Sequence, residues 1–208
     1  MTAGPRIAVV DYGAANMVSI TKALAAVGAA VSVASDPVGL SNMDAIVVPG
    51  VGAARSAMEA LEAQGLRAPI VEWARARRPL LGICLGFQVL FDASDEGNAA
   101  TLGILPGRTV EVADAPTLPH IGWNSVAYAR PHRLFEGVPE GSYFYFVHSY
   151  APAPSESSVV VGRTTHGSTF ASAAARGNVL GLQFHPEKSS DMGLRVLSNF
   201  VAIVEEAR

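Results

Sequence analysis

The stretch LLGICLGFQVLF, residues 80–91, contains the pattern around which the rest of the chain is organised. Its apolar start predicts a buried strand over Leu80–Ile83, and the residues from Leu85 to Phe91 predict a helix. Cys84 stands between the two, with a glycine two positions to either side. Because glycines let the chain turn without clashes of Cβ atoms, this G-x-C-x-G stretch predicts a nucleophile elbow. The cysteine would then project from the carboxyl edge of a sheet, where open α/β sheets place their sites.

Short apolar strands alternate with helical patterns in the first half of the chain. Before the strand at residue 80, strands are expected at Arg6–Val10, Ala30–Ala34 and Ala45–Val48. One helix ends at Gly28, and a second helical pattern runs from residue 55 to about residue 77, with a break near Gly65 or Pro69. Strands that are almost entirely apolar and alternate with helices indicate a parallel sheet covered on both faces.

The second half of the chain predicts antiparallel structure. A Pro/Ser-rich surface loop is expected at residues 151–158, and a last helix from Met192 to Glu206. Short turns such as His166-Gly167 would join neighbouring strands directly. The expected strands are residues 108–112, 143–147, 158–165, 168–174 and 179–184. Together these patterns predict one domain over residues 1–208: an α/β, flavodoxin-like three-layer open sheet with a parallel core and an antiparallel extension.

The composition restricts the classes of partner and compartment. Half of the 208 residues are hydrophobic, 16% are charged, and the formal net charge is −3. This balance argues against nucleic acid or an anionic membrane as the main partner, since both favour clustered Lys and Arg. The short basic run Arg75, Arg77, Arg78 is interpreted as the solvated end of a helix. The apolar run Ile7–Val10 is too short for a signal peptide, and the single cysteine excludes an internal disulfide, so we expect a cytoplasmic protein.

A candidate base and its orienting carboxylate follow the strand expected at residues 179–184. His185-Pro186-Glu187 begins there, and a residue before proline is held in an extended conformation. In an extended segment positions i and i+2 point the same way, so Glu187 can accept from one imidazole nitrogen while the other meets the Cys84 sulfur. The start of a helix also favours a thiolate through its positive dipole end. The alternatives are a buried core cysteine and a surface turn with a solvated glutamate.

Backbone groups beside Cys84 are candidates for an oxyanion hole. The N–H of Leu85 is free at the start of the helix, and a second donor is expected from the turn Pro49-Gly50-Val51-Gly52, at Val51 or Gly52. Gly50 and Gly52 would also let the backbone approach a ligand closely.

The remaining histidines leave several roles open. His148 either lines the site or is a satisfied, half-buried histidine, and His120 is a candidate interface or site residue. His132 and His166 are interpreted as loop histidines. No His, Cys, Asp or Glu residues show the spacing of metal ligands, so neither a metal nor a cofactor is expected.

The G-x-C-x-G elbow followed much later by H-P-E resembles the class I, triad-type glutamine amidotransferase family. Within it, the chain is similar to the glutaminase subunits of imidazole glycerol phosphate synthases, and the similar stretches span nearly the whole chain. PHIGWN and PGVG separate these subunits from relatives that make other products. The other stretches are DYGAANMVSI, VVPGVGAAR, GICLGFQ, YFVHSY, GLQFHPEKS and GLRVLSNF.

The resemblance implies that glutamine is hydrolysed through a γ-glutamyl thioester on Cys84. Gln88 lies one helical turn from Cys84 and can reach the same pocket, the alternative being an ordinary helix-surface residue. The implied glutamine contacts are Gly50, Gly52, Gln88, Glu96, His148, Ser149 and Tyr150.

The resemblance also implies a heterodimer with a separate (β/α)8-barrel cyclase subunit, which would receive the ammonia. Asn16, Trp123 and Lys188 match interface positions, although Trp123 could instead be a core aromatic. The isolated subunit is expected to be nearly idle until the partner's nucleotide ligand activates it, with the Val51–Gly52 peptide as the flexible element.

Three positions depart from the family pattern: Ala15 and Phe87, where Gly and Met are expected, and Ala151, where an aromatic residue is frequent. Three other functions remain open. They are an amidotransferase for another synthase, a redox or chaperone-like protein that uses Cys84 as a peroxide sensor, and a catalytically silent subunit.

Overall fold

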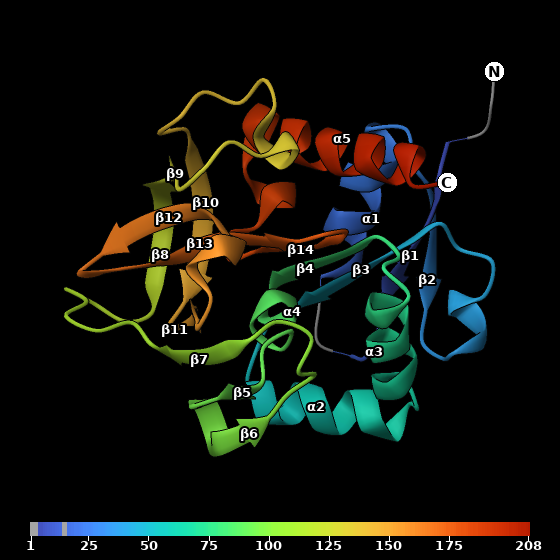
Figure 1. Ribbon diagram of the computed structural model, residues 1–208, viewed down its shortest axis with the longest axis horizontal. Coiled ribbons are helices and arrows are strands. Elements are labelled where there is room, and N and C mark those ends of the chain that lie inside the picture. Colours follow the sequence, from blue (N-terminus) through green and yellow to red (C-terminus); the bar gives the residue numbers. More distant parts are fainter. Residues whose placement is uncertain (1–3, 14–15) are drawn as a thin grey trace.

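The computed structural model describes residues 4–13 and 16–208, which form one central sheet with helices on both faces (Figure 1). The eight strands have the order β2-β1-β3-β4-β14-β13-β12-β9. The first five pair in parallel and the last three add antiparallel pairs, as expected. The bounds are β1 Arg6–Val10, β2 Ala30–Ala34, β3 Ala45–Gly50, β4 Leu80–Cys84, β9 Ala127–Tyr128, β12 Val160–His166, β13 Ser168–Arg176 and β14 Val179–Leu182.

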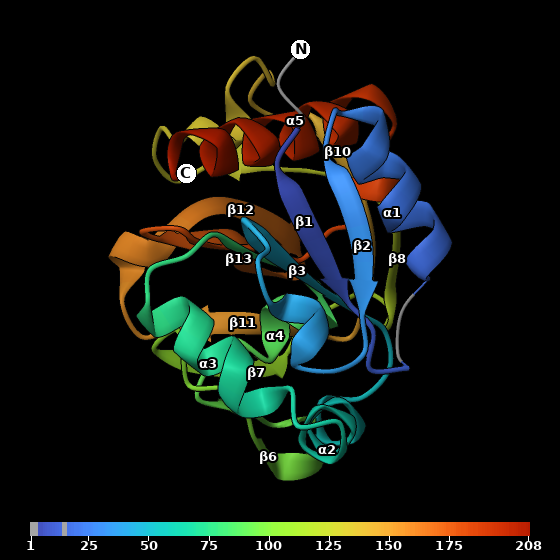
Figure 2. The same ribbon diagram turned by 90° about the vertical axis from the view of Figure 1, so that its right-hand side faces the viewer.

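Two helical layers enclose this sheet. Helices α1 (Met17–Ala26) and α5 (Ser190–Glu206) cover one face, and α2 (Ala54–Ala63), α3 (Arg67–Arg75) and the short α4 (Leu85–Gln88) cover the other (Figures 1 and 2). Alternate residues of a strand enter opposite hydrophobic clusters. In β1, Ile7 and Val9 pack with α1 and α5, whereas Ala8 and Val10 pack with α2 and α3. The central strands β3, β4 and β14 therefore carry no charged or hydroxyl side chain, because both of their faces are buried.

Two smaller sheets extend the core. β8 (His120–Ser125) pairs with β10 (Tyr143–His148), and a four-stranded sheet has the order β11-β7-β5-β6. Its strands are β5 Ala93–Ser94, β6 Ala99–Ala100, β7 Gly107–Glu111 and β11 Tyr150–Pro154. Five 3-10 turns complete the described elements: η1 Val38–Leu40, η2 Glu96–Asn98, η3 Arg133–Phe135, η4 Ser157–Val159 and η5 Pro186–Lys188.

Three expectations about individual elements were wrong. Residues 151–154, expected in a surface loop, belong to β11, whose place at a sheet edge tolerates its two prolines. Strand β8 and the two-residue strands β5, β6 and β9 were not predicted. The helix after Cys84 ends at Gln88 instead of Phe91.

The break in the second helical pattern lies at Gly65, one of the two expected positions. Gly65 has φ +68°, which ends α2, whereas Pro69 lies in the first turn of α3, where proline is tolerated. Among the helices of the described residues, none has the length and apolar character needed to cross a bilayer.

Candidate active site

Cys84 is the last residue of β4 and lies in a strained backbone conformation, with φ +53° and ψ −112°. L-residues rarely adopt such angles, and they persist where the surrounding structure enforces them. The flanking glycines show how closely the surrounding backbone packs around this turn. A Cβ on Gly82 would lie 2.7 Å from the carbonyl oxygen of Gly86, and a Cβ on Gly86 would lie 1.7 Å from that of Val48. The tight strand-to-helix turn predicted around Cys84 is therefore present.

His185 and Glu187 approach the elbow from the neighbouring strand. β14 pairs in parallel with β4, with Leu182 opposite Ile83, so residues 183–185 continue alongside Cys84. His185 is extended, and its Nδ1 lies 2.8 Å from Oε1 of Glu187, with both side chains almost completely buried. Because a carboxylate can only accept, Nδ1 carries the proton in this pair.

The other imidazole nitrogen of His185 is free for chemistry. Nε2 is buried and has no hydrogen-bond partner among residues 4–13 and 16–208. Burial lowers the pKa of His185, but the Cys84 sulfur and the Glu187 carboxylate raise it more, so that it reaches about 9. The ring is then protonated at neutral pH. An imidazolium stabilises a neighbouring thiolate and can later give its proton to a leaving group.

A cavity of about 140 Å³ opens directly beside Cys84. It is smaller than the ~300–1,000 Å³ of pockets for drug-sized ligands, which favours a compact substrate. Ten residues line it: Val51, Gly52, Cys84, Leu85, Gln88, Glu96, Val147, His148, Ser149 and Tyr150. All of these except Val147 were predicted from the sequence. The Val147 carbonyl accepts from the Cys84 thiol at 3.7 Å. Its position in a strand directly before His148 was the available signal.

Three of the named site residues stand behind this cavity instead of lining it. Gly50 pairs with Cys84 across β3 and β4, and a Cβ on it would lie 2.1 Å from the Tyr12 hydroxyl. His185 and Glu187 approach from the β14 side. Since Gly50 is level with Cys84, the next residues, Val51 and Gly52, come beside the sulfur. Gly52 has φ +100°, a conformation that suits glycine.

The polar cavity residues are held by specific hydrogen bonds. Gln88 is 4% exposed, so it is no helix-surface residue, and its Nε2 donates to the Tyr150 carbonyl at 2.7 Å. Glu96 Oε2 accepts from the Ala54 N–H at 3.0 Å. The N–H of Leu85, the first residue of α4, belongs to the helix-start donors that lack an intrahelical partner.

His148 both lines the cavity and is satisfied. Its Nδ1 lies 2.9 Å from the Tyr150 carbonyl and its Nε2 lies 3.0 Å from His120 Nδ1. Burial lowers the pKa of His148 to about 3 and that of His120 to about 4, so both rings are neutral. His166 is the last residue of β12, so its interpretation as a loop histidine is wrong, and its ring stacks on His120 with centroids 4.0 Å apart. His132 caps η3. No three His, Cys, Asp or Glu side chains within the described ranges are grouped to hold a metal ion.

The model of the family "Glutamine amidotransferase class-I" matches residues 8–204. Curated relatives named imidazole glycerol phosphate synthase subunit HisH include those of Moorella thermoacetica, 48% identical over 97% of this chain and 96% of the relative, and of Nitrosomonas europaea, 46% identical over 94% and 97%. The chain belongs to the class I glutamine amidotransferases, in the HisH family.

Solved structures support the fold of this amidotransferase at lower identity. PurLQS from Thermotoga maritima superposes with a TM-score of 0.73 at 20% identity, over 98% of each chain. A further solved glutamine amidotransferase gives a TM-score of 0.72 at 18% identity, over 95% of this chain and 98% of the other.

The residues expected at a partner interface are exposed. Trp123 is 51% exposed on β8, so its interpretation as a core aromatic is wrong. Lys188 Nζ lies 5.8 Å from the ring centroid of Tyr145, which packs edge-on against Trp123. Asn16 is exposed and caps α1 by accepting from the Ser19 N–H at 3.4 Å.

Two of the departures from the family pattern, Phe87 and Ala151, lie away from the cavity surface. Phe87 is fully buried and packs against Gly181 and Phe91, so it does not form the pocket wall. Ala151 belongs to β11 and is buried in the hydrophobic core. Ala15 lies outside the described residues.

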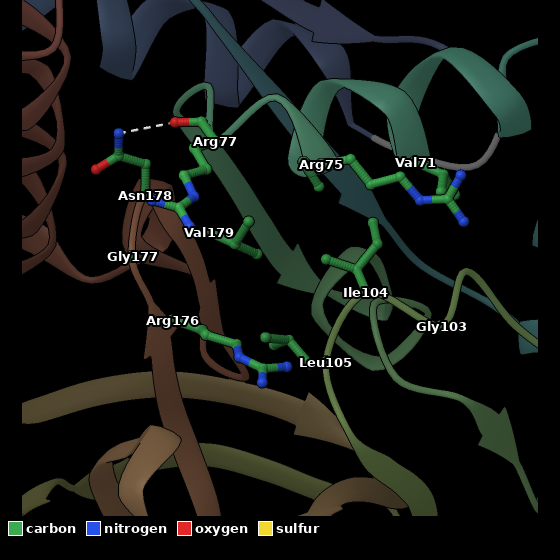
Figure 3. A pocket seen from close by; sticks show the side chains of 11 residues that line it. Val71, Arg75, Arg77, Gly103, Ile104, Leu105, Arg176, Gly177, Asn178 and Val179 are labelled. Carbon is green, nitrogen blue, oxygen red and sulfur yellow. Dashed lines mark hydrogen bonds between the residues drawn. The ribbon is translucent and has the colours of Figure 1, made fainter.

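A larger cavity of about 440 Å³ lies at the opposite edge of the sheet, where β4 and β14 begin (Figure 3). Arg75, Arg77 and Arg176 stand at its rim around the apolar side chains of Ile104 and Leu105. It contains none of the candidate catalytic groups, which all meet at the carboxyl edge.

Proposed function

We propose that Cys84 attacks the side-chain amide of glutamine as a thiolate. The sulfur bonds to the amide carbon, His185 gives its Nε2 proton to the departing nitrogen, and ammonia leaves a γ-glutamyl thioester. A water molecule, deprotonated by His185, then attacks the thioester, which releases glutamate and restores the thiolate. Glu187 keeps Nδ1 protonated and the ring oriented throughout. The observation that carries this mechanism is the buried 2.8 Å pair of His185 and Glu187 beside the strained Cys84.

The oxyanion formed in each step needs backbone donors. Leu85 N–H is one, and Val51 or Gly52 of the turn after β3 supplies the other. Removing one such donor typically costs ~2.7–4 kcal/mol of transition-state stabilisation. Gly50 lets that turn pack closely, and Gln88, Glu96, His148, Ser149 and Tyr150 surround the substrate.

The ammonia goes to a separate (β/α)8-barrel cyclase subunit, with which the chain forms a heterodimer. This cyclase makes imidazole glycerol phosphate and an aminoimidazole carboxamide ribonucleotide in histidine biosynthesis, in the cytoplasm. Support comes from the names of the relatives and from an apolar face beside the cavity. Ile121, Trp123 and Tyr143 are 61%, 51% and 61% exposed, and they share one face of the β8–β10 sheet. Patches of this kind mark docking surfaces.

Activation by the partner would act on the turn that follows β3. Val51 is 45% exposed next to the cavity, so a docked subunit can reach it. We expect the isolated chain to be nearly idle and the partner's nucleotide to switch it on through the Val51–Gly52 peptide.

The test measures ammonia release from glutamine with and without the cyclase and its nucleotide ligand, for wild type and Cys84→Ala. Strong stimulation that disappears in Cys84→Ala is expected. Full turnover by the isolated chain would overturn the activation mechanism. Absence of activity in every combination would favour a redox role, in which peroxide oxidises Cys84 equally in His185→Ala. Binding to a different synthase in a pull-down would reassign the partner.

A further inference from the structure

Gln183 is a buried side chain beside the nucleophile to which the mechanism above gives no part. It is 0% exposed and lies in the bend between β14 and His185, with its amide against Cys84. Its Nε2 lies 3.8 Å from the Cys84 sulfur, and its Oε1 lies 3.2 Å from Nε2 of Gln88. The amide thus bridges the nucleophile and a residue that lines the cavity.

The hydrogen bonds of Gln88 and Gln183 determine the orientation of both side-chain amides. The two hydrogens of Gln88 Nε2 go to the Tyr150 carbonyl at 2.7 Å and to Gln183 Oε1 at 3.2 Å. Because Oε1 of Gln183 accepts that bond, its Nε2 must face the sulfur. The Oε1 atom of Gln88 remains unused, because it accepts no hydrogen bond from any residue in the described ranges. Its position in the cavity wall offers this oxygen to a ligand.

The same arrangement gives Cys84 different partners in its two charge states. As a thiol it donates to the Val147 carbonyl at 3.7 Å. As a thiolate it can only accept, and the Gln183 N–H is then a neutral donor from the segment that also carries His185. A hydrogen bond to a buried charge stabilises that charge, so this donor favours the reactive form.

We propose that Gln183 is a positioning residue of the glutaminase reaction. It supports the Cys84 thiolate with one end of its amide, and with the other it holds Gln88 so that Oε1 accepts from an N–H donor of the substrate. The ligand class is therefore a small amino acid or amide with a free ammonium or carboxamide N–H. The inference rests on the proposed function for its catalytic consequence, although its effect on the sulfur can be measured without turnover.

The first experiment compares Gln183→Met with wild type, because Met keeps the length of the side chain and removes both hydrogen bonds. Gln64→Met at the end of α2 is the matched control. Alkylation of Cys84 by iodoacetamide is followed from pH 5 to 10, and glutaminase kinetics are measured in the cyclase complex with its nucleotide ligand. In Gln183→Met we expect the alkylation profile to move to higher pH, kcat/KM to fall about tenfold, and KM to rise. Gln64→Met should change none of these.

A wild-type measurement keeps the test decisive if Gln183→Met does not fold. In ¹⁵N-labelled protein, alkylation of Cys84 should shift the side-chain amide resonances of Gln183 and leave those of Gln64 in place. A folded Gln183→Met with the alkylation profile and KM of wild type would overturn the proposal, and so would Gln183 resonances that ignore the alkylation. If the profile moves but no variant or wild type hydrolyses glutamine, the positioning role stands and the proposed function fails.

Discussion

The strained conformation of Cys84 predicts that two inactive variants differ in stability. Cys84→Ala retains a Cβ at φ +53°, ψ −112°, whereas Cys84→Gly removes it. A residue held in such a sparsely populated region costs of order 1–3 kcal/mol. Glycine normally destabilises a folded chain by roughly 0.5–1 kcal/mol relative to alanine, since it loses more backbone freedom. The difference leaves Cys84→Gly more stable than Cys84→Ala by up to about 2.5 kcal/mol, and by about 1.25 kcal/mol at the middle of both ranges.

Thermal and urea unfolding of the isolated subunit measure this difference. One kcal/mol shifts the midpoint by about 2–4 °C in a chain of this size, so Cys84→Gly should unfold roughly 4 °C above Cys84→Ala. The control is Ala8→Gly in β1, a buried strand position without positive φ, which should lose about 1 kcal/mol. If Cys84→Gly is less stable than Cys84→Ala by an amount similar to the Ala8→Gly loss, the elbow stores no strain.

Three further outcomes follow from the site and its surface. The pKa of His185 is raised above its unfolded value to about 9. The stability that the protonated ring contributes is therefore complete below pH 6.5 and is lost as the pH rises through 9. In Cys84→Ala this decline in the free energy of unfolding should occur at lower pH, because the sulfur that raises the pKa is absent. Gly86→Ala should lose more than about 3 kcal/mol or fail to fold, since its Cβ would overlap the Val48 carbonyl, and native-like urea unfolding would contradict this. Trp123→Ala should weaken cyclase binding at least about tenfold by calorimetry and leave Cys84 alkylation in the isolated chain unchanged.

Local patterns predicted most of the core and the central part of the candidate site. The bounds of β1 and β2 were predicted to the residue. The turn at Cys84 and the pairing of His185 with Glu187 were also predictable, because each depends on residues only a few positions apart in the sequence. Strand β8 was missed because it contains Gly122 and Asn124, which have low strand propensity, and because its partner β10 lies about twenty residues away in the sequence.

Gln183 was missed for a related reason. Between Leu182 and Phe184 it interrupts an apolar run, and the residues it bonds to lie on other elements, at positions 84 and 88. Only the packing of β14 against β4 brings these groups together. A buried amide that interrupts a core strand next to a candidate histidine is the signal that could have identified it.

The exposed apolar face of β8 and β10 has a consequence for how the protein is produced in a cell. Every copy made without its partner carries large aromatic and aliphatic groups in water, and these groups associate with one another when nothing else covers them. If the second subunit docks on this face as proposed, balanced synthesis of the two subunits also protects the free chain. In production of the chain alone, yield would be limited by clustering through β8 and β10 and would recover when the second subunit is made alongside it.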